Sequence, residues 1–290
     1  NIKKYAPQAR NDFIAAMRKQ AAKYGITADS ILPAEQKGDL LLIGDQVFPL
    51  SVMKSREKLI KRIQTSSFEQ TIDYIAYSWF NRLCAIRYME CKGLLDHGRR
   101  VLSSADGSAG LPQILEECLD IDLPGLDASR VAELKLDGNK DEELYRELLL
   151  AQCHALNQVM PLLFEQVSDE SELLLPENLT KTDSLIRDLV SSIPEEDWSD
   201  VQIIGWLYQF YISEKKDQVI GKVVKSEDIP AATQLFTPNW IVKYLVQNSV
   251  GRLWLMAQPD STLANDWEYY IQPAEQTDEV NAQLKQLIDV

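Results

Sequence analysis

The apolar residues of this chain recur mostly at intervals of three and four, the spacing that places side chains on one face of an α-helix. Ser67 followed by Gln70 has the spacing of a helix-capping box, and Lys92 with Gly93 is typical of a helix end. The pattern therefore predicts a mainly α-helical protein. The predicted helices cover residues 2–24, 68–91, 112–122, 141–159, 201–213 and 278–288.

Residues 40–48 depart from the helical pattern. Two short apolar runs, residues 40–43 and 46–48, flank Gly44 and Asp45. A glycine in a two-residue connection is typical of a β-hairpin, and Pro49 ends the second run because it lacks an N–H donor. We predict a small β-hairpin at this position.

Two of the predicted helices carry distinctive side chains. The helix over residues 68–91 has an apolar stripe that includes Trp79, which predicts burial of that stripe. Arg82 and Arg87 lie off the stripe, and we expect them to face a phosphate backbone or a neighbouring domain. The helix over residues 201–213 has aromatic side chains on almost every side, which predicts burial between layers.

These elements divide the chain into four predicted parts. Residues 1–64 form a basic N-terminal helix and hairpin, residues 65–170 a helical domain, and residues 171–228 a helical connector. Residues 229–290 form the last part, which opens on a loop that leads into a helix.

Composition is that of a globular protein, with 45% hydrophobic and 26% charged residues among 290. No apolar run approaches the ~20 residues needed to cross a bilayer, so a cytoplasmic location is the default expectation. The net charge of −14 is unevenly distributed. Through Arg62, 12 Lys and Arg face 6 Asp and Glu, a balance of +6, whereas the remainder has 18 against 38, a balance of −20.

The basic N-terminal part is a candidate DNA-binding surface. Lysine and arginine side chains bind phosphates without reading sequence, so such a surface predicts backbone contacts only. The alternative, a solvated helix face, stays open at this point. The candidate residues are Lys3, Lys4, Arg10, Arg18, Lys19, Lys54, Arg56, Lys61 and Arg62.

The four cysteines and two histidines do not predict a metal site. Cys84, Cys91, Cys118 and Cys153 form no C-x-x-C pair. We expect them to be buried thiols in a reducing compartment. His97 is expected in a surface loop and His154 beside the apolar stripe of its helix, as a packing residue.

The loop and helix around residue 237 are the most informative stretch. Thr237 is suited to an N-cap and Pro238 to the first helical position, where a missing N–H is tolerated. Val242, Leu245 and Val246, with residues further along, form an apolar face that predicts packing on a larger body. The N–H groups at such a helix start suit a carboxylate or phosphate, although an ordinary capped helix explains the same residues.

The segment Gln234, Leu235, Phe236, Thr237 and Pro238 resembles the (Q)-x-F-T-P-x-x-[IL]-V segment, called motif X, of adenine-N6 DNA methyltransferases. Three longer stretches, residues 204–216, 229–238 and 244–254, are similar to the N-terminal region of the PglX-type methyltransferases of BREX phage-defence systems. Residues 74–89 and 269–275 also fit, so the resemblance extends from about Phe68 to the end of the chain.

This resemblance implies a Rossmann-like methyltransferase domain of which only the start, motif X, lies in this chain. It implies S-adenosylmethionine as cofactor, with Phe236, Thr237 and Pro238 lining its pocket and Gln234 and Leu235 nearby. Thr237 is then expected to bond the methionine moiety of the cofactor.

Two segments of that family do not occur here: the glycine-rich D-P-A-C-G-S-G segment that binds the cofactor and the N-P-P-[YF] segment that positions adenine. We therefore expect a piece of a longer protein that does not methylate by itself. The implied partners are double-stranded DNA and other BREX proteins. An alternative from another class is a non-catalytic interaction module whose acidic part docks defence proteins or a phage-encoded inhibitor.

Overall fold

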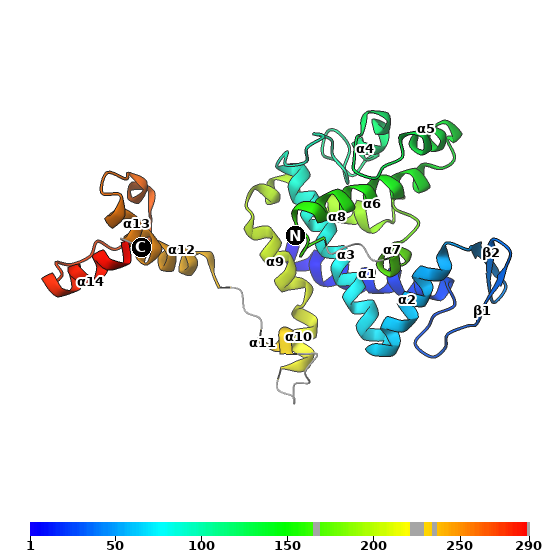
Figure 1. The fold of residues 1–290 in the computed structure, drawn as a ribbon, viewed down its shortest axis with the longest axis horizontal. Coiled ribbons are helices and arrows are strands. Elements are labelled where there is room, and N and C mark those ends of the chain that lie inside the picture. The colour runs from blue at the N-terminus through cyan, green and yellow to red at the C-terminus, as the bar shows by residue number, and fades with distance from the viewer. Residues whose placement is uncertain (165–168, 221–228, 234–236, 289–290) are drawn as a thin grey trace. The chain divides into compact units, whose positions relative to one another are not determined.

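A computed structural model describes residues 1–164, 169–220, 229–233 and 237–288 (Figure 1). The chain forms two compact units, Asn1–Ala232 and Thr233–Val290. None of the described helices is long and apolar enough to span a membrane. The elements in chain order are α1 (Ile2–Lys23), β1 (Ala34–Lys37), β2 (Leu40–Ile43), β3 (Gln46–Pro49), α2 (Val52–Thr65), α3 (Phe68–Cys91), α4 (Gln113–Glu116), η1 (Cys118–Asp120), α5 (Ala128–Asp137), α6 (Asp141–Val159), α7 (Asp169–Leu173), α8 (Leu185–Ser192), η2 (Glu195–Ser199), α9 (Gln202–Tyr211), α10 (Ser213–Val219), α11 (Ile229–Thr233), α12 (Asn239–Asn248), α13 (Val250–Ala257), η4 (Leu263–Asp266) and α14 (Asp278–Ile288).

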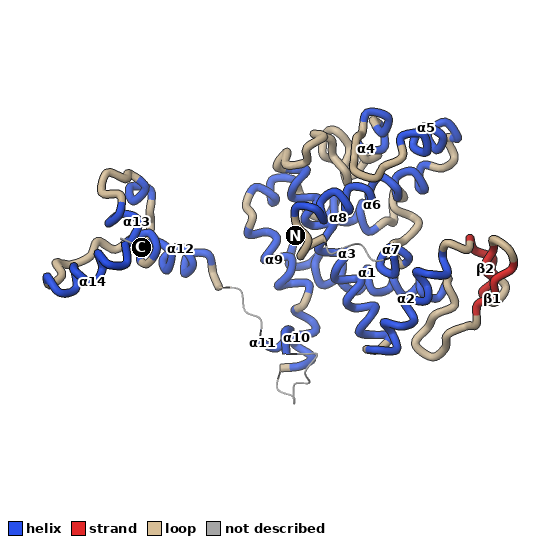
Figure 2. The backbone as a smooth tube through the Cα atoms, viewed as in Figure 1, coloured by secondary structure: helices blue, strands red, loops and turns tan. Residues whose placement is uncertain are grey.

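The prediction of a mainly helical protein is confirmed: helices dominate the chain in Figure 2, and strands occupy one small region. The first unit is built around α3, with α1 packed against both α3 and α9. The predicted cap of α3 is confirmed, because the Ser67 side chain accepts a hydrogen bond from the Gln70 N–H at 3.2 Å. Gly93 has a φ of 63°, a left-handed conformation that ends the helix.

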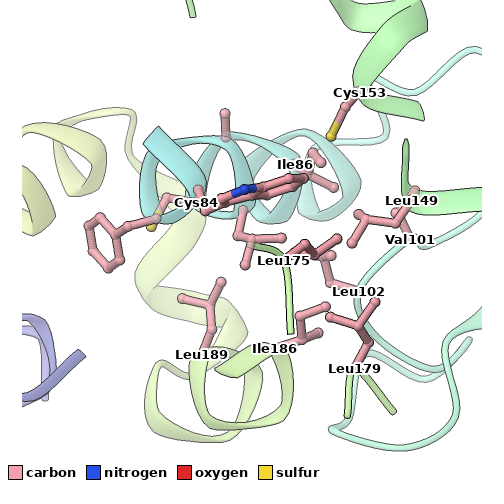
Figure 3. Close-up of a cluster of buried hydrophobic side chains, with 14 of the residues drawn as sticks. Cys84, Ile86, Val101, Leu102, Leu149, Cys153, Leu175, Leu179, Ile186 and Leu189 are labelled. Atoms are coloured by element: carbon pink, nitrogen blue, oxygen red, sulfur yellow. The ribbon is translucent and has the colours of Figure 1, made fainter. Parts of the chain in front are cut away.

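One hydrophobic core runs through the first unit, from Tyr5 in α1 to Tyr211 in α9. Figure 3 shows part of it, a cluster to which α3 contributes Cys84 and Ile86, a loop contributes Leu102, and the later part of the unit contributes Leu175 and Ile186. The first three predicted parts, residues 1–64, 65–170 and 171–228, all contribute to this unit. Helices distant in sequence therefore share one core, which is what fixes their mutual positions.

The predicted hairpin is confirmed, and the structure adds a third strand. Strands β2 and β3 pair antiparallel with Leu41 opposite Phe48, around the turn at Gly44 (φ 55°). Strand β1 pairs with the other edge of β2, giving the order β1-β2-β3. All four β1 residues are exposed, so β1 lacks the apolar pattern that identifies a strand in the sequence.

The expectation for Arg82 and Arg87 is wrong, because both side chains are buried in the first unit. The Arg87 guanidinium donates to Glu90 at 2.5 Å and to Ser103 at 2.8 Å. The guanidinium carbon of Arg82 lies 5.1 Å from the centroid of the Trp79 ring. A fully buried arginine needs a partner of opposite charge or several acceptors, and the Glu90 carboxylate meets that need for Arg87.

The predicted burial of residues 201–213 between layers is only half right. Ile203, Leu207 and Tyr211 of α9 are buried against the core, whereas Trp206 is 45% exposed. Aromatic side chains on several faces therefore do not imply that every face is covered. One face of α9 packs on α1 and α3, and Trp206 lies on the surface.

In the second unit the predicted single helix after residue 238 is two helices. Helix α12 begins at Asn239, one residue later than predicted, with Pro238 and not Thr237 at the cap position. The helical conformation is interrupted at Ser249, whose φ and ψ are −118° and −90°, and α13 begins at the next residue. The backbone of Gly251 lies close to the ring of Trp267, because a Cβ on Gly251 would lie 2.8 Å from that ring.

Candidate nucleic-acid interface and cofactor segment

Five of the nine predicted DNA-binding residues are lysines on the surface of the first unit. Within the part of the chain that the structure describes, none of the five forms an ion pair. Each ammonium group is therefore available to an anion from solution. These residues are Lys3, Lys4 and Lys19 on α1 and Lys54 and Lys61 on α2.

The two predicted arginines of α1 are engaged by carboxylates of α3. Arg10 Nη2 lies 2.5 Å from Asp73 Oδ1, and Arg18 pairs with Glu69. Asp73 also lies 3.4 Å from the Lys215 ammonium nitrogen of α10. These pairs tie α1 to α3, so a phosphate contact by either arginine requires exchange of its carboxylate partner.

The two predicted arginines of α2 have different roles. Arg56 is 5% exposed and donates to the carbonyl oxygens of Tyr24 at 2.8 Å and Leu32 at 2.5 Å. Burial lowers its pKa from the ordinary value. Arg56 is thus a structural residue and leaves the set of candidate phosphate contacts. Arg62 lies 4.1 Å from the Tyr74 ring centroid and 3.4 Å from a Glu170 oxygen.

Two open grooves follow α1. The first, of about 620 Å³, lies between α1 and the start of α3 and is lined by Arg10, Arg18 and Lys215 as well as Glu69 and Asp73. Its charges are mixed, and its cations already have carboxylate neighbours.

The second groove, of about 740 Å³, lies between α1 and residues 176–185. It brings Lys19 and Lys23 together with Lys181, a residue that the sequence did not single out, and its charges are mixed as well, because Asp12, Glu177 and Asp183 also line it. No local pattern marks Lys181, because its proximity to α1 exists only in the folded chain.

The predicted cofactor segment is described only in part. Gln234, Leu235 and Phe236 lie outside the described residues. Thr237 and Pro238 are exposed, and Pro238 caps α12 with a φ of −51° and a ψ of 138°. The extended backbone at Pro238 places Thr237 just ahead of the first turn of the helix.

Helix α12 has no buried residue. Trp240, Val242, Leu245 and Val246 are between 41% and 56% exposed. Among the described residues of the whole second unit, Gly251 alone is buried. A group of apolar side chains of this size on one short helix is typical of a surface that packs against something else.

The histidines and cysteines are structural residues. The prediction of buried thiols is confirmed for Cys84, Cys118 and Cys153 and is wrong for Cys91, which is half-buried. His97 is half-buried and bonded to Gln152 at 2.7 Å, while His154 is exposed and bonded to Glu172 at 2.8 Å, so His154 is not a packing residue. Burial raises the pKa of the Cys91 thiol to about 11 and of the Cys153 thiol to about 12. Within the described ranges, no group of three or more His, Cys, Asp or Glu is placed to hold a metal ion.

Comparison with known proteins gives two matches. The chain is 60% identical over 291 residues to the adenine-specific methyltransferase BrxX of Escherichia coli O9:H4 (strain HS), which covers 98% of this chain and 24% of that protein. It is 35% identical over 314 residues to the adenine-specific methyltransferase PglX of Lacticaseibacillus casei (strain Zhang), covering 97% of this chain and 26% of that protein. No family model matches the chain.

These matches identify the class of protein: the chain is a segment related to adenine-specific methyltransferases. More particularly, it is related in sequence to BrxX and PglX, and the resemblance to PglX-type proteins predicted from its motifs is confirmed. The chain spans about a quarter of the length of these two relatives.

Proposed function

We propose that the longer protein of which this chain is a segment is a site-specific adenine-N6 DNA methyltransferase that uses S-adenosylmethionine and acts in a BREX phage-defence system. The observation that carries this proposal is the 60% identity to BrxX over nearly the whole chain. At that level of identity, two proteins share their fold and, as a rule, the role of the shared segment.

The chain's own contribution is to position other parts of the enzyme. The exposed apolar side chains of α12 and the shortage of buried residues around them support packing of the second unit on a further domain. Among the described residues of this unit only Gly251 is buried, so most of its apolar surface is left for a partner to cover. That partner is the Rossmann-like domain that carries the cofactor.

The segment from Gln234 to Pro238 is proposed to contact the cofactor at the edge of that domain. Thr237 offers a hydroxyl and the following helix offers free N–H groups, both of which suit the methionine carboxylate of S-adenosylmethionine. In the complete enzyme, Phe236→Ala or Thr237→Ala should weaken cofactor binding and leave the fold intact. Calorimetric titration measures this, and unchanged affinity in both variants would refute the site.

The five exposed lysines of α1 and α2 are proposed to bind DNA phosphates. Their free ammonium groups and the positive balance of the first 62 residues support this assignment. Such contacts hold the duplex without selecting a sequence, so the recognition site is read elsewhere in the protein.

A methylation assay tests the proposal directly. The complete protein should transfer a labelled methyl group from S-adenosylmethionine to adenine in DNA, and the 290-residue chain should transfer none. Transfer to cytosine, or no transfer by the complete protein under any condition that preserves its fold, would overturn the proposal.

A non-catalytic interaction module remains the second candidate, favoured by the balance of −20 after Arg62. It predicts that the 290-residue chain binds other BREX proteins through its acidic surface and binds no DNA. Both functions are compatible within one complete protein, so pull-down with the separate BREX proteins and DNA binding need to be measured on the same sample.

A further inference from the structure

The second unit contains a pocket that is separate from the residues assigned above to cofactor and DNA. Its volume is about 510 Å³, within the range of small-molecule sites. Three segments form its walls: Arg252, Leu255 and Met256 from α13, residues 270–276, and Asn281 with Leu284 from α14. The walls combine one cation with an aromatic ring and apolar side chains.

Arg252 has no partner within the described chain. Its side chain is half-buried, its Nε is shielded from solvent, and it makes no hydrogen bond or ion pair there. Of its guanidinium nitrogens only Nε is shielded from solvent, so the two Nη groups are left to donate to an anion. Arginine binds carboxylate or phosphate through two such N–H donors. An anionic group in the pocket would supply that partner.

The pocket wall formed by residues 270–276 is fixed by contacts to α12 and to Trp267. The Tyr269 N–H donates to Gln247 at 2.9 Å, and the Ile271 N–H donates to Asn248 at 2.8 Å. The Tyr270 ring lies 5.6 Å from the Trp267 ring, edge to face. The aromatic face of the pocket is therefore held in place before any ligand arrives, which lowers the entropic cost of binding.

Residues 275, 276 and 281 bring acceptor oxygens to the pocket. Gln276 Nε2 donates to the Ala274 carbonyl at 2.7 Å, and Asn281 Nδ2 donates to the Gln276 carbonyl at 3.4 Å. Their side-chain oxygens and the Glu275 carboxylate are left to accept from a ligand. A complementary ligand thus carries an anionic group for Arg252, an amino donor for these oxygens, and a flat body for Tyr270.

We propose that this pocket binds an adenine nucleotide, with its phosphate on Arg252, its ring against Tyr270 and its amino group toward Glu275 and Gln276. An aminopurine ring supplies the flat body and the amino donor. The phosphate supplies the anionic group, which a planar guanidinium binds through two N–H groups where a lysine ammonium acts as a point charge. The site does not depend on the methyltransferase assignment, since it uses none of the residues from Gln234 to Pro238.

Titration calorimetry of the 290-residue chain with AMP and with adenosine tests the proposal. Arg252→Gln should weaken AMP binding at least about tenfold and leave adenosine binding unchanged, because adenosine has no phosphate. Tyr270→Leu should weaken both ligands. Lys243→Gln, which removes an exposed positive charge of the same unit on α12, is the matched control and should change neither.

Three results would overturn the proposal. The first is that the unmodified chain does not bind AMP. The second is that Arg252→Gln lowers the affinity for AMP and for adenosine equally. The third is that the chain binds S-adenosylmethionine but not AMP. The last result would make the pocket part of the methyl-donor site. Failure of methylation by the complete protein with AMP binding retained would instead overturn the proposed function alone.

Discussion

Arg87 and Glu90, one helical turn apart on α3, form a buried ion pair with 2.5 Å between Nη1 and Oε1. The Glu90 carboxylate also accepts the N–H groups of Val101 and Leu102 at 2.7 and 2.8 Å. Arg87 in turn reaches the Gly107 carbonyl at 3.2 Å. The pair therefore anchors the loop of residues 96–110 to the central helix and determines the path of a segment that has no regular structure of its own.

Arg87→Ala should destabilise the first unit by ~3 to 5 kcal/mol, because it leaves the Glu90 carboxylate buried and unpaired. Chemical denaturation followed by circular dichroism measures the change in the free energy of unfolding. Arg130→Ala is the matched control, since Arg130 pairs with Glu133 and Glu143 at the surface, and its effect should be much smaller. Equal effects of the two substitutions would contradict a structural role for the buried pair.

Neutralising the exposed lysines should weaken DNA binding in a salt-dependent way. Each lysine that holds a phosphate contributes about 0.9 to the slope of log affinity against log salt concentration. Changing Lys3, Lys4 and Lys19 to Gln should lower the slope by the number of lost contacts, as measured by fluorescence anisotropy with duplex DNA. The same number of changes at Lys37, Lys140 and Lys285 keeps the net charge equal and should leave the slope unchanged. If both triple variants bind alike, the contribution of α1 is one of net charge only.

Gly251→Ala should disturb the second unit, because the added methyl group meets the Trp267 ring at 2.8 Å. Overpacking of this kind typically costs ~1 to 3 kcal/mol. Near-ultraviolet circular dichroism of the tryptophans reports the displaced ring. The double variant Gly251→Ala with Trp267→Phe should recover part of the loss, since the smaller ring frees the space. Strictly additive effects would mean that the two residues do not touch.

His154 should make stability depend on pH near neutrality. The hydrogen bond to Glu172 raises the pKa of His154 above its ordinary value of 6.5, against an opposing effect of burial and Arg82. The stabilisation is therefore fully present below the unfolded-state pKa and is lost as the pH rises through the folded-state pKa. Thermal denaturation of the chain and of His154→Gln should differ most at about pH 5.5 and converge by about pH 8.5. A difference that grows with pH would reverse the sign and contradict this contact.

Local signals in the sequence predicted most of the helices and the hairpin. Ser67 with Gln70 locates the start of α3 because the cap uses atoms three residues apart. Gly44 locates the turn between β2 and β3 for the same reason, since a turn is decided within four residues. Strand β1 was missed because its partner, β2, determines its pairing while its own side chains are all exposed.

The candidate binding residues were predictable only as residue types. Nothing in the sequence separates Lys19, which is exposed and makes no ion pair with any described residue, from Arg56, which is buried against two carbonyl oxygens. Lys181 joins the groove along α1 and Arg252 joins the pocket of the second unit through contacts between distant segments. Burial and ion pairing depend on the whole fold, so they cannot be read from one stretch of chain.

The sequence by itself determined the helical class, the caps and turns, the uneven charge and the relationship to PglX-type methyltransferases, all of which depend on neighbouring residues or on matched segments. The tertiary structure decided which charged side chains remain available. It turned Arg82 and Arg87 inward, paired Arg10 with Asp73 and left Arg252 without a partner among the described residues. The physical reason is that a charge is stabilised or exposed according to what the rest of the fold places around it.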